Sequence, residues 1–225
     1  MKVFYILTAL FITISCSNNT THSDNLENDS KSAKIQTFWN WFESKSEEYL
    51  NFAKNKTELF NLLSEELHNV NPSITFVFGE MKDNKREFII SADGIKEAFP
   101  DVEALVSAAP KINKWEIIAF RPRLNTFLSM SFDGLTVSPD DLKIKYSYDS
   151  LSKKVGLEIY IKNYNESDQR YLSAAFLILD NALGEYDVET KIGAIDFKTL
   201  PDDYKSLELI SINELPNIVD NYFKK

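Results

Sequence analysis

The chain has few of the residues that interrupt secondary structure, form disulfides or act as general bases. Its 225 residues include 6 glycines, 7 prolines, 2 histidines and 1 cysteine. So little glycine and proline excludes collagen-like and proline-rich disordered chains. Basic residues are also few, with 25 Lys and Arg against 34 Asp and Glu, which gives a formal net charge of -9. Because binding to a polyanion needs clustered Lys and Arg, we expect no nucleic-acid partner.

Apolar side chains are in normal supply at 44% of the total, which is enough for a packed core. Some of them form an N-terminal run, in which Lys2 is followed by the uncharged residues 3–14. A membrane-spanning helix needs roughly 20 apolar residues, so this run is too short for a stable transmembrane helix. A basic residue followed by a short apolar run is typical of a signal peptide, which we predict over residues 1–15.

The only cysteine, Cys16, directly follows that run, with the small Ser15 before it and polar residues after it. This arrangement resembles the lipobox of bacterial lipoproteins, although Thr13 stands where that pattern favours Leu. The resemblance implies that Cys16 becomes the lipidated first residue of the mature chain, which would anchor the protein to a membrane of the bacterial cell envelope. Two or more acyl chains hold a protein stably at a membrane. The alternative is an ordinary secretory signal that is cut slightly further on.

Residues 16–33 differ in composition from the rest of the chain. They are polar, and Leu26 is their only large apolar side chain. Such a segment buries too little surface to offset the entropy lost on ordering, so we predict a flexible polar linker over 16–33. Residues 34–225 fall within the size of a single domain and contain no second linker, so we predict one globular domain there.

The hydrophobic periodicity of this domain changes several times along the chain. Apolar residues at helical spacing predict helices over 35–53, 55–68, 102–106, 172–183 and 211–223. Extended or alternating apolar patterns predict strands over 74–78, 87–91, 115–120, 142–148 and 155–161, with short further strands over 192–197 and 207–210. Helices together with neighbouring hairpins predict an α+β fold, in which helices pack on a mostly antiparallel sheet.

The common catalytic and nucleotide-binding motifs are absent from the sequence. The glycines lie too far apart for a dinucleotide-binding turn or a phosphate-binding loop, and there is no Gly-x-Ser-x-Gly elbow or His-Glu-x-x-His helix. His22 falls in the predicted linker, and His68 falls at a predicted helix end, where a charged imidazole interacts well with the helix dipole. We therefore predict no cofactor, no metal and no assigned catalytic residue.

Acidic residues cluster near the end of the helix predicted over 172–183. The cluster consists of Asp180, Glu185, Asp187 and Glu189. If 185–189 were extended, its three carboxylates would project from one face and would need relief from their mutual repulsion. A calcium ion is one source of relief, but the spacing does not match an EF-hand loop. Solvation is another.

Arginine is the third source of relief. Arg121 and Arg123 flank Pro122 after a predicted buried strand, and guanidinium groups form bidentate pairs with carboxylates. Such pairs would be structural, or they would belong to a ligand site. The residues that we single out as ligand-binding candidates are Arg121, Arg123, Glu185 and Asp187.

Several stretches of the domain together resemble a family of uncharacterised bacterial proteins of unknown function. They are residues 38–42, 90–94, 108–110 with Trp115, 121–123 and 183–185. The resemblance covers most of residues 35–200. It implies no activity, but it directs attention to the segments around Arg121 and Glu185.

The sequence favours an envelope lipoprotein that acts as a binding or interaction module, whose partner would be an envelope protein or a small-molecule ligand. One alternative is a carboxylate-dependent hydrolase, which would need a concave pocket where two carboxylates converge and at least one has a raised pKa. The other is an immunity-type inhibitor, which would present a flat acidic face to a basic partner.

Overall fold

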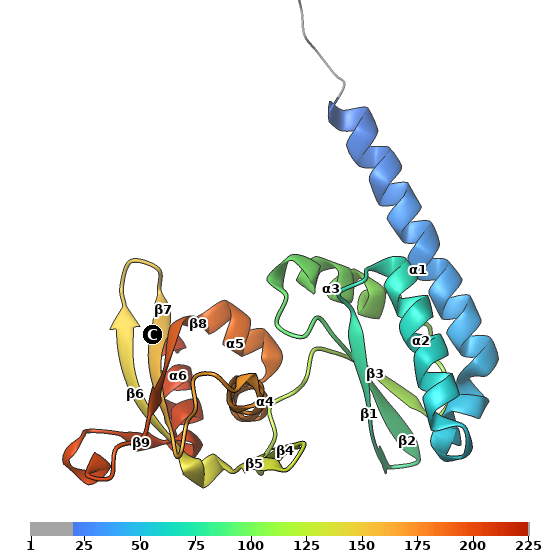
Figure 1. Cartoon of the computed structure of the whole chain (residues 1–225). Coiled ribbons are helices and arrows are strands. Elements are labelled where there is room, and N and C mark those ends of the chain that lie inside the picture. Colours follow the sequence, from blue (N-terminus) through green and yellow to red (C-terminus); the bar gives the residue numbers. More distant parts are fainter. Residues whose placement is uncertain (1–19, 225) are drawn as a thin grey trace, which may run out of the picture.

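The protein has an α+β fold, which is divided into two lobes (Figure 1). The computed structural model describes the backbone of residues 20–224 and the side chains of residues 29–224; Cys16 and the predicted signal peptide lie outside these ranges. The N-lobe, residues 35–120, surrounds one hydrophobic core, and the C-lobe, residues 130–223, surrounds another. The range predicted as one globular domain thus contains two separate cores.

The N-lobe combines three main helices with a three-stranded sheet. Its elements are α1 (Thr20–Leu50), α2 (Lys56–Val70), β1 (Thr75–Lys82), β2 (Lys85–Ser91), α3 (Phe99–Ser107) and β3 (Trp115–Ala119). The strand order is β1-β2-β3, with β1 and β2 antiparallel and β2 and β3 parallel. The predicted hairpin is confirmed: Asp83 and Asn84, between β1 and β2, both have positive φ angles, as tight hairpin turns require.

Aromatic side chains on α1 form much of the N-lobe core. Phe38, Trp39 and Phe42 are each at most 1% exposed. Phe42 stacks on Phe88 of β2, with 4.7 Å between ring centroids. The buried indole N–H of Trp39 donates to the carbonyl of Leu105 at 2.8 Å, which satisfies a polar group inside the core and links α1 to α3.

Helix α1 begins earlier than the sequence predicts. Residues 20–33, which belong to the predicted flexible linker, are helical in the structure, and α1 extends well beyond the N-lobe (Figure 1). No glycine or proline interrupts residues 20–50, so a helix nucleated by the buried stripe from Ile35 onward can propagate at the gain of one hydrogen bond per residue. Lys31 of this extension pairs with Asp101 of α3.

The C-lobe contains a four-stranded sheet and a small hairpin. Its elements are β4 (Met130–Phe132), β5 (Leu135–Val137), β6 (Leu142–Asp149), β7 (Lys154–Ile161), α4 (Gln169–Leu183), α5 (Glu185–Lys191), β8 (Ile192–Thr199), β9 (Ile210–Ser211) and α6 (Leu215–Phe223). The strand order is β8-β7-β6-β9, with β7 and β8 parallel and the other pairs antiparallel. The predicted alternation is confirmed in β7, where Val155, Leu157, Ile159 and Ile161 are all buried.

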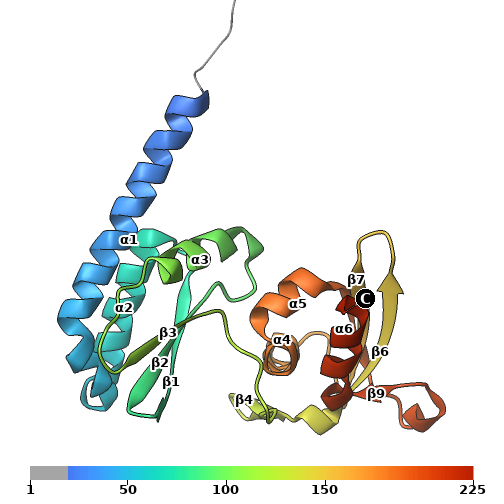
Figure 2. The ribbon, with the colours of Figure 1, turned by 180° about the vertical axis from the view of Figure 1, so that it is seen from behind.

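Both lobes contain the same order of elements. In each, an antiparallel hairpin leads through helical structure to a third strand that lies parallel to the second: β1, β2, α3 and β3 in the N-lobe, and β6, β7, α4 with α5, and β8 in the C-lobe. Seen from behind, the two lobes stand side by side, and the segment after β3 crosses between them (Figure 2).

Two helix starts carry residue pairs typical of a capping box, Ser211 with Glu214 and Asn55 with Glu58. Ser211 and Glu214 form a capping box before α6. Asn55 precedes α2, but its side chain makes no capping hydrogen bond to a described residue. Within residues 20–224, no helix combines the length and the apolar character that a membrane span requires.

Candidate functional site

The chain passes between the lobes directly after β3. Phe120 is buried and has a φ angle of 64°, which is rare for a bulky residue. Its N–H donates to the carbonyl of Ile90 at 2.8 Å, so the chain turns sharply while it remains attached to β2. Residues 121–124 follow, and we refer to them as the crossing segment. The N–H of Leu124 donates to the carbonyl of Asn181 at 2.8 Å, which attaches the crossing segment to α4.

Glu185, the first residue of α5, connects the lobes through the backbone. Its side chain is 1% exposed. Oε1 accepts hydrogen bonds from the N–H groups of Ala92 at 3.0 Å and Gly94 at 3.3 Å, and Oε2 accepts from the N–H of Arg121 at 3.0 Å. A buried carboxylate is costly unless donors surround it, and here one C-lobe side chain supplies the acceptor for three N-lobe and crossing-segment donors.

The Arg121 guanidinium lies beside this carboxylate and binds both lobes. Nε and Nη2 donate to Oδ2 of Asp180 at 3.1 and 2.7 Å, while Nη1 donates to Oγ of Ser91 at 2.8 Å and to Oδ1 of Asp93 at 3.0 Å. Burial alone would lower the pKa of Arg121, but Glu185 and Asp180 raise it above its ordinary value. We refer to Asp93, Arg121, Asp180 and Glu185 as the interlobe cluster.

Arg123 forms a second set of ion pairs, within the C-lobe. Its guanidinium donates to both oxygens of Asp220 on α6, at 2.9 and 3.1 Å, and to Asp187 on α5 at 3.2 Å. Lys191 also donates to Asp187, at 2.7 Å. The hydrogen bond from Arg123 lowers the pKa of Asp220. These contacts hold the crossing segment against α5 and α6.

Gly184 allows the crossing segment to approach this closely. It ends α4 with a φ angle of 82° and a ψ angle of 143°, a conformation that is nearly restricted to glycine. A Cβ atom at this position would lie 3.2 Å from the backbone nitrogen of Arg123. The sequence predicts that Gly184 ends this helix in the left-handed conformation. The helix does end there with a positive φ, but the ψ angle of 143° lies outside the left-handed region.

Aromatic packing adds an apolar contact between the lobes. The ring of Tyr186 on α5 lies 5.9 Å from that of Phe99 and 5.4 Å from that of Phe120, measured between centroids. Phe99 and Phe120 themselves lie 4.4 Å apart. The lobes therefore meet through ion pairs, backbone hydrogen bonds and a small aromatic cluster.

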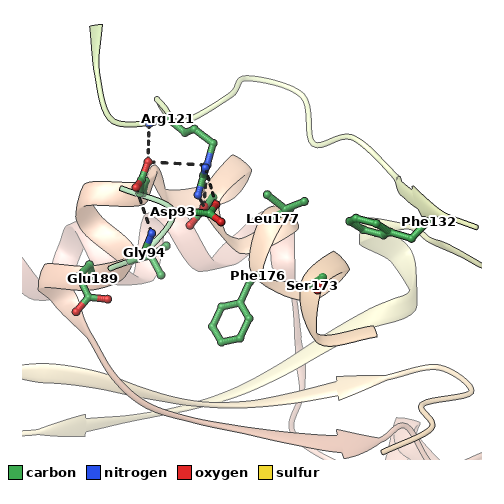
Figure 3. Close-up of a pocket in the computed structure, with 11 residues that line it drawn as sticks. Asp93, Gly94, Arg121, Phe132, Ser173, Phe176, Leu177 and Glu189 are labelled. Atoms are coloured by element: carbon green, nitrogen blue, oxygen red, sulfur yellow. Dashed lines mark hydrogen bonds and ion pairs between the residues drawn. The ribbon is translucent and has the colours of Figure 1, made fainter. Parts of the chain in front are cut away.

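A pocket of about 490 Å³ opens beside the interlobe cluster. Its polar wall includes Asp93, Arg121, Asp180 and Glu189, and its apolar wall includes Phe132, Phe176, Leu177 and Val188. Figure 3 shows Arg121 beside Asp93 and Gly94, with Phe176 and Glu189 projecting from the helices of the C-lobe. We refer to this space as the interlobe pocket.

Asp180 has the most perturbed acidic group in the pocket. It is 8% exposed, and burial raises its pKa to about 6 even though Arg121 opposes the shift. Both hydrogen bonds from Arg121 go to Oδ2, and no residue among 29–224 forms a hydrogen bond to Oδ1. Asp180 therefore presents one unpaired oxygen from a nearly buried carboxylate.

The structure separates the four ligand-binding candidates into two places. Arg121 and Glu185 line the interlobe pocket, whereas Arg123 and Asp187 pair with each other outside its lining. Both arginines pair with carboxylates of the predicted acidic cluster. The extended conformation considered for 185–189 is not the one adopted, because these residues begin helix α5, where acidic side chains in the first turn interact favourably with the helix dipole.

The sequence gives no sign of several residues that line or support the pocket. Ser91 and Asp93 lie in one of the stretches that resemble the uncharacterised family, but nothing in that stretch indicates a contact with Arg121. The helical periodicity places Phe176 on a buried face, yet it is 42% exposed.

His68 lies exposed in the last turn of α2. In the part of the chain that the structure describes, no three His, Cys, Asp or Glu side chains gather as a metal site would require.

Comparison with known proteins adds no relative, since no protein-family model, curated protein or solved structure matches this chain. The resemblance to uncharacterised bacterial proteins therefore stays a prediction.

Proposed function

We propose that this protein is a bacterial envelope lipoprotein, lipidated at Cys16, that binds a small ligand in the interlobe pocket. The observation that carries the proposal is the pocket itself, about 490 Å³ in volume and walled by both lobes. This volume lies within the range of small-molecule sites, which occur preferentially at the boundaries between folded units.

The composition of the walls also supports a ligand site. Small-molecule pockets are mostly apolar and carry a few convergent polar groups that orient the ligand. Phe176, Leu177 and Val188 supply the apolar surface here, and the interlobe cluster supplies the polar groups. The cluster is held by hydrogen bonds from both lobes, so the polar groups are oriented before any ligand arrives.

The test of ligand binding uses a neutral aromatic probe, 1-naphthalenemethanol, with the full-length protein. We expect the probe to raise the midpoint of thermal unfolding saturably, because binding to the folded state alone contributes about 2.7 kcal/mol at a probe concentration 100 times Kd. Ser173→Trp places an indole in the pocket and should weaken binding at least tenfold.

The matched control is Gln169→Trp, which adds the same side chain to the same helix at an exposed position outside the pocket lining. This variant should bind the probe as the parent protein does. Unsaturable binding, or equal affinity in Ser173→Trp and Gln169→Trp, would contradict the proposed site.

The lipid anchor has a separate test. Cells that express the full-length protein are labelled with radioactive palmitate and then fractionated. We expect label in the protein and recovery with membranes, and we expect Cys16→Ser to lose both, because the buried acyl chains supply the membrane affinity. Label that persists in Cys16→Ser would contradict the assignment of Cys16.

One observation favours the hydrolase alternative. Asp180 and Glu189 line the same pocket, and burial raises the pKa of Asp180 to about 6, in the range of a general acid. This alternative predicts that the protein releases sugars from envelope glycan and that Asp180→Asn abolishes the release. Equal activity of the parent and Asp180→Asn, or no release by the parent, would rule against it.

A further inference from the structure

The interlobe pocket has an excess of negative charge. Among residues 29–224, four carboxylates line it, those of Asp93, Asp180, Glu185 and Glu189, against the single guanidinium of Arg121. No Lys or His of these described residues is part of the lining. The pocket walls therefore attract cations and repel anions over the short distances at which a bound ligand lies.

The guanidinium of Arg121 is already occupied by protein groups. Arg121 uses four of its five N–H donors, two for Asp180 and one each for Ser91 and Asp93. Glu185 is likewise occupied, because three backbone N–H groups donate to its oxygens. An anionic ligand would have to displace buried ion pairs in order to reach Arg121, which is costly.

Acceptors, in contrast, remain free. Oδ1 of Asp180 receives no hydrogen bond from residues 29–224, although its side chain is nine-tenths buried. The carboxylate of Glu189 has no hydrogen-bond or ion-pair partner in the same part of the chain; only its backbone carbonyl is used, by Lys154. A group that brings donors and positive charge would satisfy both carboxylates.

The apolar wall of the pocket favours a ligand with a hydrocarbon portion. Phe176 is 42% exposed and makes an edge-on contact with Phe197, with the ring centroids 5.3 Å apart. Leu177, Val188 and Phe132 extend this apolar surface. An aromatic face beside an acidic group also attracts a cation directly through its π electrons.

Resting on the proposed ligand site, we propose that its ligand is an organic cation with an apolar body. An ammonium or guanidinium group would bind Oδ1 of Asp180 and the carboxylate of Glu189, and the carbon skeleton would lie on Phe176 and Leu177. Ligands of this class include aromatic and aliphatic amines and the basic side chains of peptides.

The test compares three probes with the same ring and different charges, by thermal unfolding of the full-length protein. The probes are 1-naphthylmethylamine (cationic), 1-naphthalenemethanol (neutral) and 1-naphthaleneacetate, the carboxylate of 1-naphthaleneacetic acid (anionic). We expect the cation to bind at least tenfold more tightly than the neutral probe, and the anion to bind more weakly than both.

Variants assign this preference to particular carboxylates. Glu189→Gln, which leaves the contacts of Arg121 intact, should reduce the preference for the cation to about threefold or less while the affinity for the neutral probe stays unchanged. Asp180→Asn should act in the same direction. Glu208→Gln removes an exposed carboxylate that does not line the pocket and should change nothing.

The possible failures are distinguishable. If the neutral or anionic probe binds as tightly as the cation and Ser173→Trp still blocks it, the cation inference is overturned and the proposed ligand site stands. If none of the three probes binds in a way that Ser173→Trp weakens, both fail. Stabilisation by calcium chloride alone that Glu189→Gln abolishes would assign the site to a metal ion and would overturn the inference.

Discussion

At the scale of single residues, Gly184 and Glu185 join the lobes through the backbone. Gly184 gives the backbone a conformation that brings the crossing segment close, and Glu185 then supplies an acceptor for three backbone N–H groups. The Glu185 carboxylate is difficult to replace, because its removal leaves three backbone N–H donors without their acceptor at once.

Gly184→Ala should destabilise the protein by about 3 kcal/mol, because Ala is strained at this φ and ψ and its Cβ would crowd Arg123. The measurement is urea unfolding. Gly134→Ala is the matched control, since Gly134 also has a positive φ, of 84°, but a Cβ there would meet no described residue beyond its chain neighbours within 4 Å. It should cost only about 1 kcal/mol. Equal losses would show that the close approach of the crossing segment contributes nothing.

Asp180 gives the stability of the protein a specific pH dependence. Its pKa is about 6 in the folded protein against 3.8 for a free Asp, so the folded state holds this proton more tightly. Folding stability from this group is therefore present below about pH 4 and is lost as the pH rises through 6. The loss is on the order of 3 kcal/mol.

The measurement is the difference in unfolding free energy between the parent protein and Asp180→Asn at pH 4 and pH 7. Groups with lowered pKa values, such as Asp220, are common to both proteins and cancel. We expect the parent to lose stability relative to the variant as the pH rises. A constant difference, or one of opposite sign, would contradict the raised pKa.

At the scale of elements, most helices and hairpins could be predicted, because the spacing of their apolar residues is visible within a short stretch of sequence. Three segments could not, and one of them is the short β4–β5 hairpin, which has no counterpart among the predicted strands. Residues 185–189 alternate in charge as a strand would, but they form a helix because Gly184 and the buried Glu185 fix its start. Residues 20–33 are too polar to fold alone, and they are helical as a continuation of the packed part of α1.

A pair of proline substitutions tests the two parts of α1. Ser30→Pro lies in the extension and Gln36→Pro in the packed part, and both side chains are exposed. Gln36→Pro should cost about 3 kcal/mol or more, because it breaks the helix against the core. Ser30→Pro should lower the helical circular dichroism signal but change the unfolding free energy by less than about 0.5 kcal/mol. Similar losses in both variants would contradict this division of the helix.

At the scale of the whole molecule, the two cores raise the question of how cooperatively the lobes unfold. The interlobe cluster and the aromatic contact of Tyr186 cross between them, and breaking a buried ion pair by removal of one partner typically costs about 3–5 kcal/mol. We expect these contacts to couple the lobes into a single unfolding unit.

The chain offers a direct measurement of this coupling, because all three tryptophans, Trp39, Trp41 and Trp115, lie in the N-lobe. In the parent protein, tryptophan fluorescence and far-ultraviolet circular dichroism should report the same urea midpoint. In Arg121→Ala/Glu185→Ala the two midpoints should separate. Coincident midpoints in this variant would mean that the lobes are coupled by other contacts, and separate midpoints in the parent would mean that they are independent.

Local order along the chain was sufficient to predict the α+β class, the hairpins β1–β2 and β6–β7 and the end of α4 at Gly184, since each depends on residue type and short spacing. It offered arginine pairing only as one of three ways to relieve the repulsion within the acidic cluster. The two cores and the interlobe pocket were not predictable in this way. The pocket joins groups that lie far apart in the chain, such as Arg121 with Asp93, 28 residues apart, and Glu185 with Ala92, 93 residues apart. Such contacts depend on how the completed sheets and helices pack, and one sequence contains no short-range signal of that packing.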